Sequence, residues 1–115
     1  MLRPLPVYSV TLKRDGSAHW RGEAFTRLGS YRGELFEGDF ENLAAFIERS
    51  GFFDWADRYA EEVTDNAEYA LEVVRHGRTK RVEQYATDEP RDFWTIATLV
   101  DGVASLIEWV PDEKA

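Results

Sequence analysis

The first part of the chain alternates apolar and polar residues, which is the pattern of a half-buried strand. We predict a strand over residues 7–13, then a turn at Asp15 and Gly16. A three-residue loop with Gly16 in the left-handed conformation places apolar residues opposite apolar residues on a second strand, whereas a two-residue loop mixes apolar and charged ones. The predicted register pairs Leu12 with Ala18, Val10 with Trp20 and Tyr8 with Gly22.

A third strand and a helix are predicted next. Residues 30–35 continue the alternation, and apolar residues recur at helical spacing over residues 40–49. Asp39 suits the N-cap because its side chain can accept a hydrogen bond from the first turn. Gly51 suits the left-handed position that ends a helix, with Phe52 packing back on the last turn.

The following segment combines aromatic residues with carboxylates. We predict a short helical turn over residues 54–60, which puts Trp55 and Tyr59 on one face. The carboxylates of the segment are Asp54, Asp57, Glu61, Glu62, Asp65 and Glu68. A calcium-binding loop of the EF-hand type needs a central glycine, which this segment lacks. We therefore expect a solvated acidic loop without a metal site.

A hairpin follows, with strands at residues 69–74 and 79–85. Its register places Glu72 opposite Arg81, an opposite-charge pair across the strands. The positive residues of its turn region are Arg75, Arg78, Lys80 and Arg81. We expect them to complement the acidic segment of the same molecule rather than nucleic acid.

A second helix is predicted over residues 90–109, with an apolar face wide enough to lie across a sheet. Gly102 within it costs about 1 kcal/mol relative to Ala. We expect a strand or an aromatic ring to approach closely there.

These elements predict an α+β fold in two layers. An antiparallel sheet of about five strands, in the order β-β-β-α-β-β-α, carries two helices on one face. The length of 115 residues suits a single domain, residues 1–115, with an ordered core at about residues 6–110.

The composition of the chain excludes some kinds of chemistry and disfavours some binding partners. The formal net charge of -8 disfavours nucleic-acid and anionic-membrane binding but permits a basic protein partner. The absence of cysteine excludes disulfides and thiolate chemistry. The opening residues lack an apolar signal region and no long apolar run follows, so we expect a cytoplasmic protein, monomeric or weakly dimeric.

The sequence offers no catalytic constellation. His19 and His76 are its two histidines, and each is expected to be solvated because no convergent partner accompanies it. The motifs of hydrolase elbows, zinc proteases and phosphate-binding loops do not occur. We predict no catalytic residue, no cofactor and no bound metal.

Several short motifs together resemble a bacterial domain family of unknown function. They are Pro6-Val7-Tyr8-Ser9-Val10, Asp15-Gly16, Trp20-Arg21-Gly22, Gly51-Phe52-Phe53, Thr64-Asp65 and Gly77-Arg78-Thr79-Lys80-Arg81-Val82. Members of that family open with a Cys-Pro-x-Tyr strand and carry a Gly-x-x-Lys-x-Val hairpin. The resemblance covers roughly residues 6–109 and implies no assigned activity. Leu5 stands where the family commonly has Cys, so any thiol-dependent role of relatives is absent here.

Two functions from different classes stay open. The first is a non-enzymatic protein-interaction module, inhibitor-like or immunity-like, whose partner-binding residues are Asp54, Trp55, Arg58, Tyr59 and Asp65. The second is a small-ligand-binding protein or enzyme with a pocket between the helices and the loop at residues 54–65. For Trp55 and Tyr59 the alternative to partner binding is that they cap one end of the core.

Overall fold

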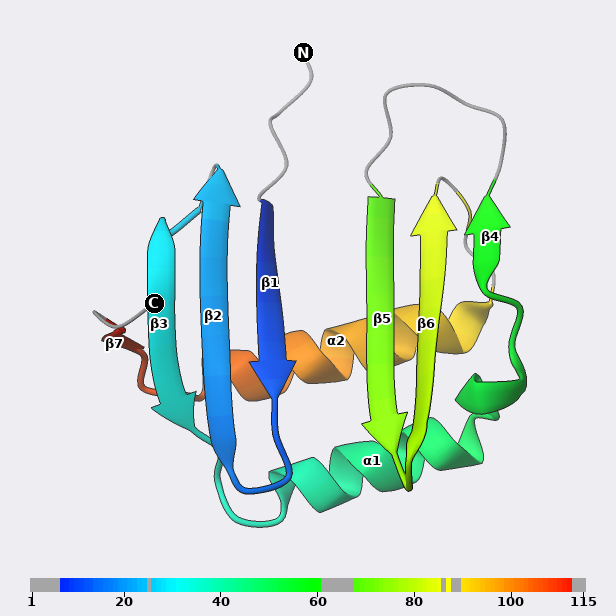
Figure 1. The fold of residues 1–115 in the computed structure, drawn as a ribbon, viewed down its shortest axis with the longest axis horizontal. Coiled ribbons are helices and arrows are strands. Elements are labelled where there is room, and N and C mark those ends of the chain that lie inside the picture. The colour runs from blue at the N-terminus through cyan, green and yellow to red at the C-terminus, as the bar shows by residue number, and fades with distance from the viewer. Residues whose placement is uncertain (1–6, 25, 61–67, 86, 88–89, 113–115) are drawn as a thin grey trace. The chain divides into compact units, whose positions relative to one another are not determined.

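The computed structural model describes residues 7–24, 26–60, 68–85, 87 and 90–112 (Figure 1). Its elements are β1 (Val7–Leu12), β2 (Ser17–Ala24), β3 (Gly29–Glu34), α1 (Asp39–Arg49), the 3₁₀ turn η1 (Phe52–Asp54), β4 (Arg58–Ala60), β5 (Glu68–Arg75), β6 (Arg78–Tyr85), α2 (Arg91–Ser105) and β7 (Val110–Pro111). The α+β class and the order β-β-β-α-β-β-α are confirmed, with the short strands β4 and β7 added. The predicted motifs at residues 5 and 6 and at residues 64 and 65 lie outside the described residues.

The strands belong to two sheets rather than to the single predicted sheet. β1, β2, β3 and β7 form an antiparallel sheet in that order, and β4, β6 and β5 form a mixed sheet. The chain divides into two compact units, residues 1–43 with 100–115 and residues 44–99, and the division falls within both helices. Alternation of apolar residues fixes the pairing inside a hairpin but carries no information on whether two hairpins share an edge.

The first hairpin has the predicted register, with Val10 opposite Trp20. Gly16 in its loop has a φ of 91°, in the left-handed region. The Asp15 carboxylate accepts hydrogen bonds from the hydroxyl and the N–H of Ser17, at 2.6 and 2.9 Å. These bonds, the hydroxyl bond foremost, lower the pKa of Asp15. Local interactions therefore fix this loop.

Aromatic rings pack on one face of the first sheet. Trp20 stacks on Tyr8 with ring centroids 4.6 Å apart, and Trp109 lies 6.2 Å from Trp20. The Tyr8 hydroxyl donates a hydrogen bond of 3.2 Å to the Asp101 carboxylate on α2. The adjacent Ala18 is fully buried. This face therefore forms the core of the first unit.

The second helix ends at Ser105, so the predicted end at Trp109 is wrong. The N–H groups of Leu106 and Ile107 bond to carbonyls three residues back, which tightens the last turn. Ile107 then packs against Gly33, where a Cβ would lie 2.3 Å from the Ile107 Cγ2 atom. The chain continues into β7, which pairs with β3. A long-range contact therefore overrides the helical pattern.

The close approach predicted at Gly102 is wrong. This residue is exposed, and a Cβ there would meet no heavy atom within 4 Å. Its cost to the helix, about 1 kcal/mol relative to Ala, has no packing reason in the described residues.

The first helix begins one position earlier than predicted. The Asn42 N–H donates to the Gly38 carbonyl at 3.0 Å, so Gly38 occupies the N-cap position and Asp39 the first helical position. The Asp39 carboxylate still lies near the positive end of the helix.

Among the described residues, no helix is long and apolar enough to span a membrane.

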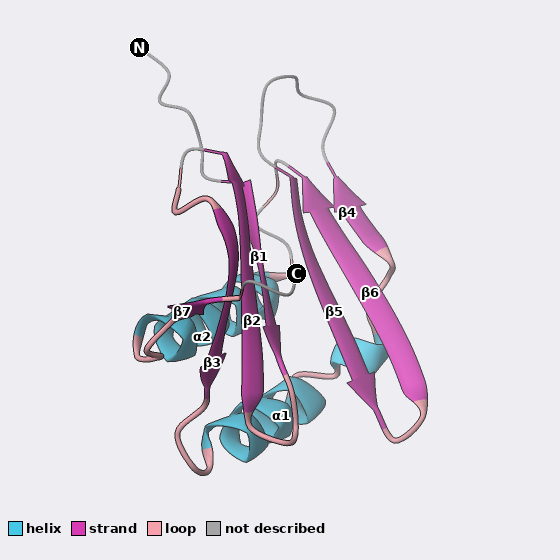
Figure 2. Ribbon diagram, turned by 60° about the vertical axis from the view of Figure 1, so that its left-hand side comes forward, coloured by secondary structure: helices cyan, strands magenta, loops and turns pink. Residues whose placement is uncertain are grey.

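The second hairpin also has the predicted register, with Glu72 opposite Arg81. His76 and Gly77 form its turn with φ values of 52° and 75°, the conformation that matches the twist of two paired strands. The second half of α1 and the first half of α2 lie on one face of this sheet (Figure 2). Among the described residues of this unit, the buried ones are Ala44, Ile47, Phe52, Val82, Gln84, Phe93 and Ile96.

Gly33 and Gly102 form a matched pair for a stability test. Gly33→Ala should lower the free energy of unfolding by about 1–3 kcal/mol, because its methyl group overlaps Ile107. Gly102→Ala should raise it by about 0.5–1 kcal/mol through helix propensity. Urea unfolding followed by circular dichroism measures both. Equal stability of Gly33→Ala and the wild type would contradict the packing of Ile107 on β3.

Candidate functional site

The candidate site begins where α1 ends. Gly51 has a φ of 78°, as its predicted place in the cap requires, and its N–H donates to the Glu48 carbonyl at 3.2 Å. The Ser50 hydroxyl donates to the Ile47 carbonyl at 2.6 Å, which satisfies another carbonyl of the last turn. Phe52 follows with a fully buried side chain. The Ser-Gly pair therefore turns the chain from the helix into η1.

The helical turn predicted over residues 54–60 is wrong. The chain instead forms η1 and then β4, which runs parallel to β6 with Tyr59 opposite Gln84. Trp55 lies between the two elements: its Nε1 donates to the Ser50 carbonyl at 3.2 Å, and its ring lies 5.3 Å from that of Phe52. The pairing with β6 joins segments far apart in sequence, and no local pattern predicts it.

Arg58 and Tyr59 are neighbours on β4, so they point to opposite faces of the sheet. The Tyr59 hydroxyl accepts a hydrogen bond of 3.0 Å from the Ala56 N–H. Trp55 and Tyr59 are both half-buried and bond to the backbone of their own segment. Both side chains therefore help to hold the segment in place.

Lys80 fastens this segment to β6. Its Nζ donates to the Trp55 carbonyl at 2.5 Å and to the Asp57 Oδ1 at 2.6 Å. Only 16% of the Lys80 side chain is exposed, whereas 86% of the Asp57 side chain is. The prediction that the basic turn complements the acidic segment is confirmed for this pair.

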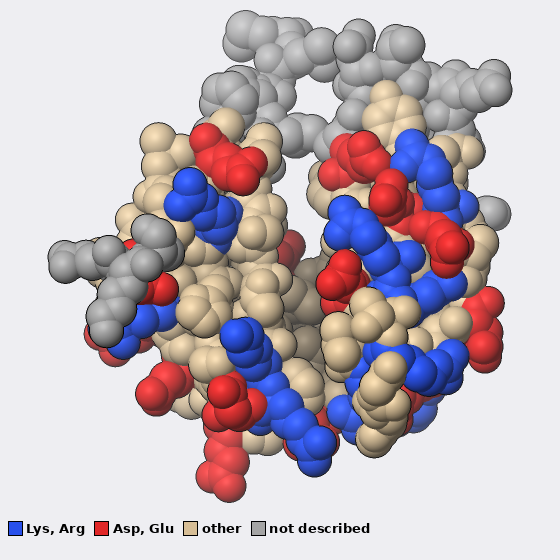
Figure 3. Space-filling view, in the orientation of Figure 1, with Lys and Arg blue, Asp and Glu red and all other residues tan. Residues whose placement is uncertain are grey.

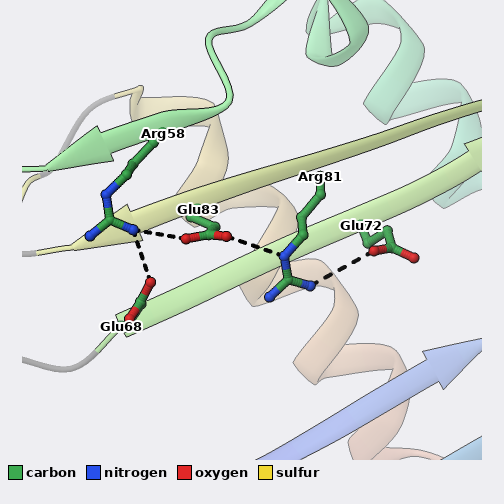
Figure 4. A network of polar contacts seen from close by, with 5 residues as sticks. All are labelled: Arg58, Glu68, Glu72, Arg81 and Glu83. Carbon is green, nitrogen blue, oxygen red and sulfur yellow. Dashed lines mark hydrogen bonds and ion pairs between the residues drawn. The ribbon is translucent and has the colours of Figure 1, made fainter.

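The sheet face opposite the helices carries a row of alternating charges (Figure 4). Arg58 pairs with Glu83 at 2.8 Å and with Glu68 at 3.0 Å, and Arg81 pairs with Glu83 at 3.4 Å and with Glu72 at 3.8 Å. In the space-filling view, acidic and basic side chains intermix over β4, β5 and β6 (Figure 3). Such exposed pairs contribute little stability each.

The row shifts two pKa values. The hydrogen bond from Arg58 lowers the pKa of Glu68, and the bond to Glu68 raises the pKa of Arg58. In both residues the hydrogen bond stabilises the charged form of the side chain. The described groups with resolved shifts, these two and Asp15, all have polar partners that explain them, and none of them lies in a cleft.

A cleft of about 300 Å³ lies beside η1. Residues before β4 and residues of the second hairpin line it, all within residues 44–99: Glu48, Gly51, Phe53, Asp54, Arg75, His76 and Arg78. Glu48 Oε1 lies 2.5 Å from the Arg75 Nε and 3.5 Å from the His76 Nε2. The Arg78 guanidinium lies over the Phe53 ring, 4.7 Å from its centroid.

Four of the predicted partner-binding residues lie in residues 54–59, but the structure does not place them on one surface. Asp54 faces the cleft, Trp55 packs inward, and Arg58 lies in the row of charges. Asp65 lies outside the described residues. The cleft adds Phe53, Arg75 and Arg78, which the sequence analysis did not assign to the site, although the basic turn was a signal for the two arginines.

Comparison with known proteins gives a family but no activity. A profile described as "Domain of unknown function (DUF6438)" matches residues 5–104. The chain belongs to the DUF6438 family. No curated protein and no solved structure matches it. The resemblance to a domain family of unknown function is confirmed at this level.

Among the described residues, no group of three or more His, Asp or Glu side chains is placed to hold a metal ion. The described carboxylates of the acidic segment instead pair with arginine and lysine or face solvent.

The charge row gives a pH prediction. Arg58→Gln should raise the pKa of Glu68, because it removes the hydrogen bond that lowers this pKa. The folded-state pKa of Glu68 lies below its unfolded value, so the stabilisation exists above the unfolded pKa and is lost as pH falls through the folded one. Titration of the carboxyl carbon resonances by NMR measures the pKa in both variants.

Arg75→Gln is the control, since Arg75 pairs with Glu48 and not with Glu68. It should leave the titration of Glu68 as it is in the wild type. A Glu68 pKa that does not respond to Arg58→Gln would contradict the pairing.

A second prediction concerns the hydrogen bonds that Lys80 donates to Trp55 and Asp57. Lys80→Met should lower the free energy of unfolding by about 1–3 kcal/mol, because it leaves the Trp55 carbonyl without its donor. Arg78→Met, on the same strand, should change stability by no more than about 0.5 kcal/mol. Urea unfolding compares the two. A smaller loss for Lys80→Met than for Arg78→Met would refute the assignment.

Proposed function

We propose that this DUF6438 domain is a non-enzymatic protein-interaction module that binds a basic segment of a partner through residues 54–59. The observation that carries the proposal is the rigid presentation of carboxylates. Asp54 and Asp57 are exposed, while the backbone between them is held by the bonds of Trp55 and Lys80. A loop that is already ordered loses less conformational entropy when it binds.

Charge favours a basic partner. The net charge of -8 accelerates association with a positive surface and slows encounters with phosphate backbones. Asp57 already has Lys80 as a partner, whereas the Asp54 carboxylate forms no hydrogen bond or ion pair with any described residue. A lysine or arginine of the partner is therefore attracted more strongly by Asp54 than by Asp57.

The remaining predicted residues hold the binding segment in place and do not contact the partner in this proposal. Trp55 and Tyr59 fix the segment from within, and Arg58 ties its far end to β5 and β6 through Glu68 and Glu83. An inhibitor-like or immunity-like protein works in this manner, by presenting a preformed acidic surface to the basic site of another protein.

The test is capture of a partner from the lysate of the native host on the immobilised full-length chain. The double variant Asp54→Asn, Asp57→Asn should lose a protein that the wild type retains, and the retained protein should leave the wild type as salt concentration rises. Quantitative mass spectrometry of the bound fractions measures this.

The matched control removes two negative charges elsewhere, with Glu23→Gln and Glu37→Gln at exposed sites of the other unit. This variant should retain the partner. Equal retention by all three proteins, or equal loss in both variants, would overturn the assignment of residues 54–59 as the binding segment.

A further inference from the structure

The cleft beside η1 contains an arginine with no carboxylate partner among the described residues. In the same unit Arg58, Arg75, Lys80 and Arg81 each pair with a carboxylate. The Arg78 guanidinium instead lies over the Phe53 ring, and no hydrogen bond or ion pair joins it to any described residue. The Phe53 ring thus orients the planar guanidinium, whose N–H groups can donate two hydrogen bonds to one carboxylate.

The opposite charge in the cleft is also unpaired. The Asp54 carboxylate lines the same cleft as Arg78 and bonds to no described side chain. Glu48, the other carboxylate of the lining, is occupied by Arg75 and His76. One free cation and one free anion therefore share a concave surface.

This arrangement selects among ligands. A phosphate dianion would be attracted by Arg78 but repelled by Asp54, while the paired charges of Glu48 and Arg75 offset each other. A simple cation would be attracted by Asp54 but repelled by Arg78. A molecule with both a carboxylate and an ammonium group satisfies Arg78 and Asp54 together. The cleft volume of about 300 Å³ is at the small end of ligand sites and fits a molecule of amino-acid or dipeptide size.

The geometry points to a binding site for a small zwitterion in this cleft, with its carboxylate on Arg78 and its ammonium group on Asp54. Phe53 supports the guanidinium from one side, and the Glu48–Arg75 pair holds the end of α1 to the start of the turn. Free amino acids and the ends of short peptides share this chemistry. The site does not depend on the proposed partner binding, although both use Asp54.

The test is titration of the full-length chain, labelled with ¹⁵N, with five probes: L-lysine, glycylglycine, glycylglycine amide, acetate and inorganic phosphate. L-lysine or glycylglycine should shift the amide resonances of Gly51 and Gly77, which flank the cleft, more strongly than acetate or phosphate do. Response to L-lysine assigns free amino acids, and response to glycylglycine alone assigns peptide ends. Glycylglycine amide lacks the carboxylate and should not bind.

Arg78→Gln and Asp54→Asn should each weaken the bound zwitterion about tenfold or more, the scale of one charge-assisted hydrogen bond. Arg81→Gln is the control, because Arg81 is on the same strand but on the opposite face of the sheet. It should leave the affinity unchanged.

Three results would overturn the site: no shift with any zwitterion, tighter binding of phosphate, or equal binding by the wild type and Arg78→Gln. Failure of the proposed partner binding is a separate result. Arg78 lies outside residues 54–59, so Arg78→Gln should weaken zwitterion binding while retaining the partner.

Discussion

The ammonium group of Lys80 is the contact on which the candidate site depends. It joins a strand of the second hairpin to the carbonyl of Trp55 and the carboxylate of Asp57, with most of the lysine side chain withdrawn from water. A charge that is largely buried is costly unless it is fully bonded, so the segment that supplies its acceptors is held to one position. β4 and Asp54 follow from that position, since both lie on the same short stretch of chain.

The arginines and the lysine of β4, β5 and β6 divide into two groups with different roles. Those with carboxylate partners, Arg58, Arg75, Lys80 and Arg81, hold segments of the chain together. Arg78 differs because an aromatic ring orients it and leaves its donors to the cleft.

Asp54 connects the two proposals. It lies at the end of a turn that Gly51 and Trp55 hold in place, and it is both exposed at the surface and part of the cleft lining. A partner and a small zwitterion would therefore compete for the same carboxylate, and a ligand in the cleft would alter the surface that the partner meets. Such coupling requires no conformational change, only a shared charge.

The local parts of this protein can be predicted from the sequence: both hairpin registers, the left-handed loop at Gly16, the cap of α1 at Gly51 and the α+β order. Each depends on neighbours a few residues apart, where alternation and turn geometry leave one solution. Long-range contacts set the separation into two sheets, the early end of α2 where Ile107 packs on Gly33, and β4 in place of a helical turn. It also decided which charges were left unpaired at the cleft. These features join residues distant in sequence, and their free energies arise from packing and charge pairing that no local pattern encodes.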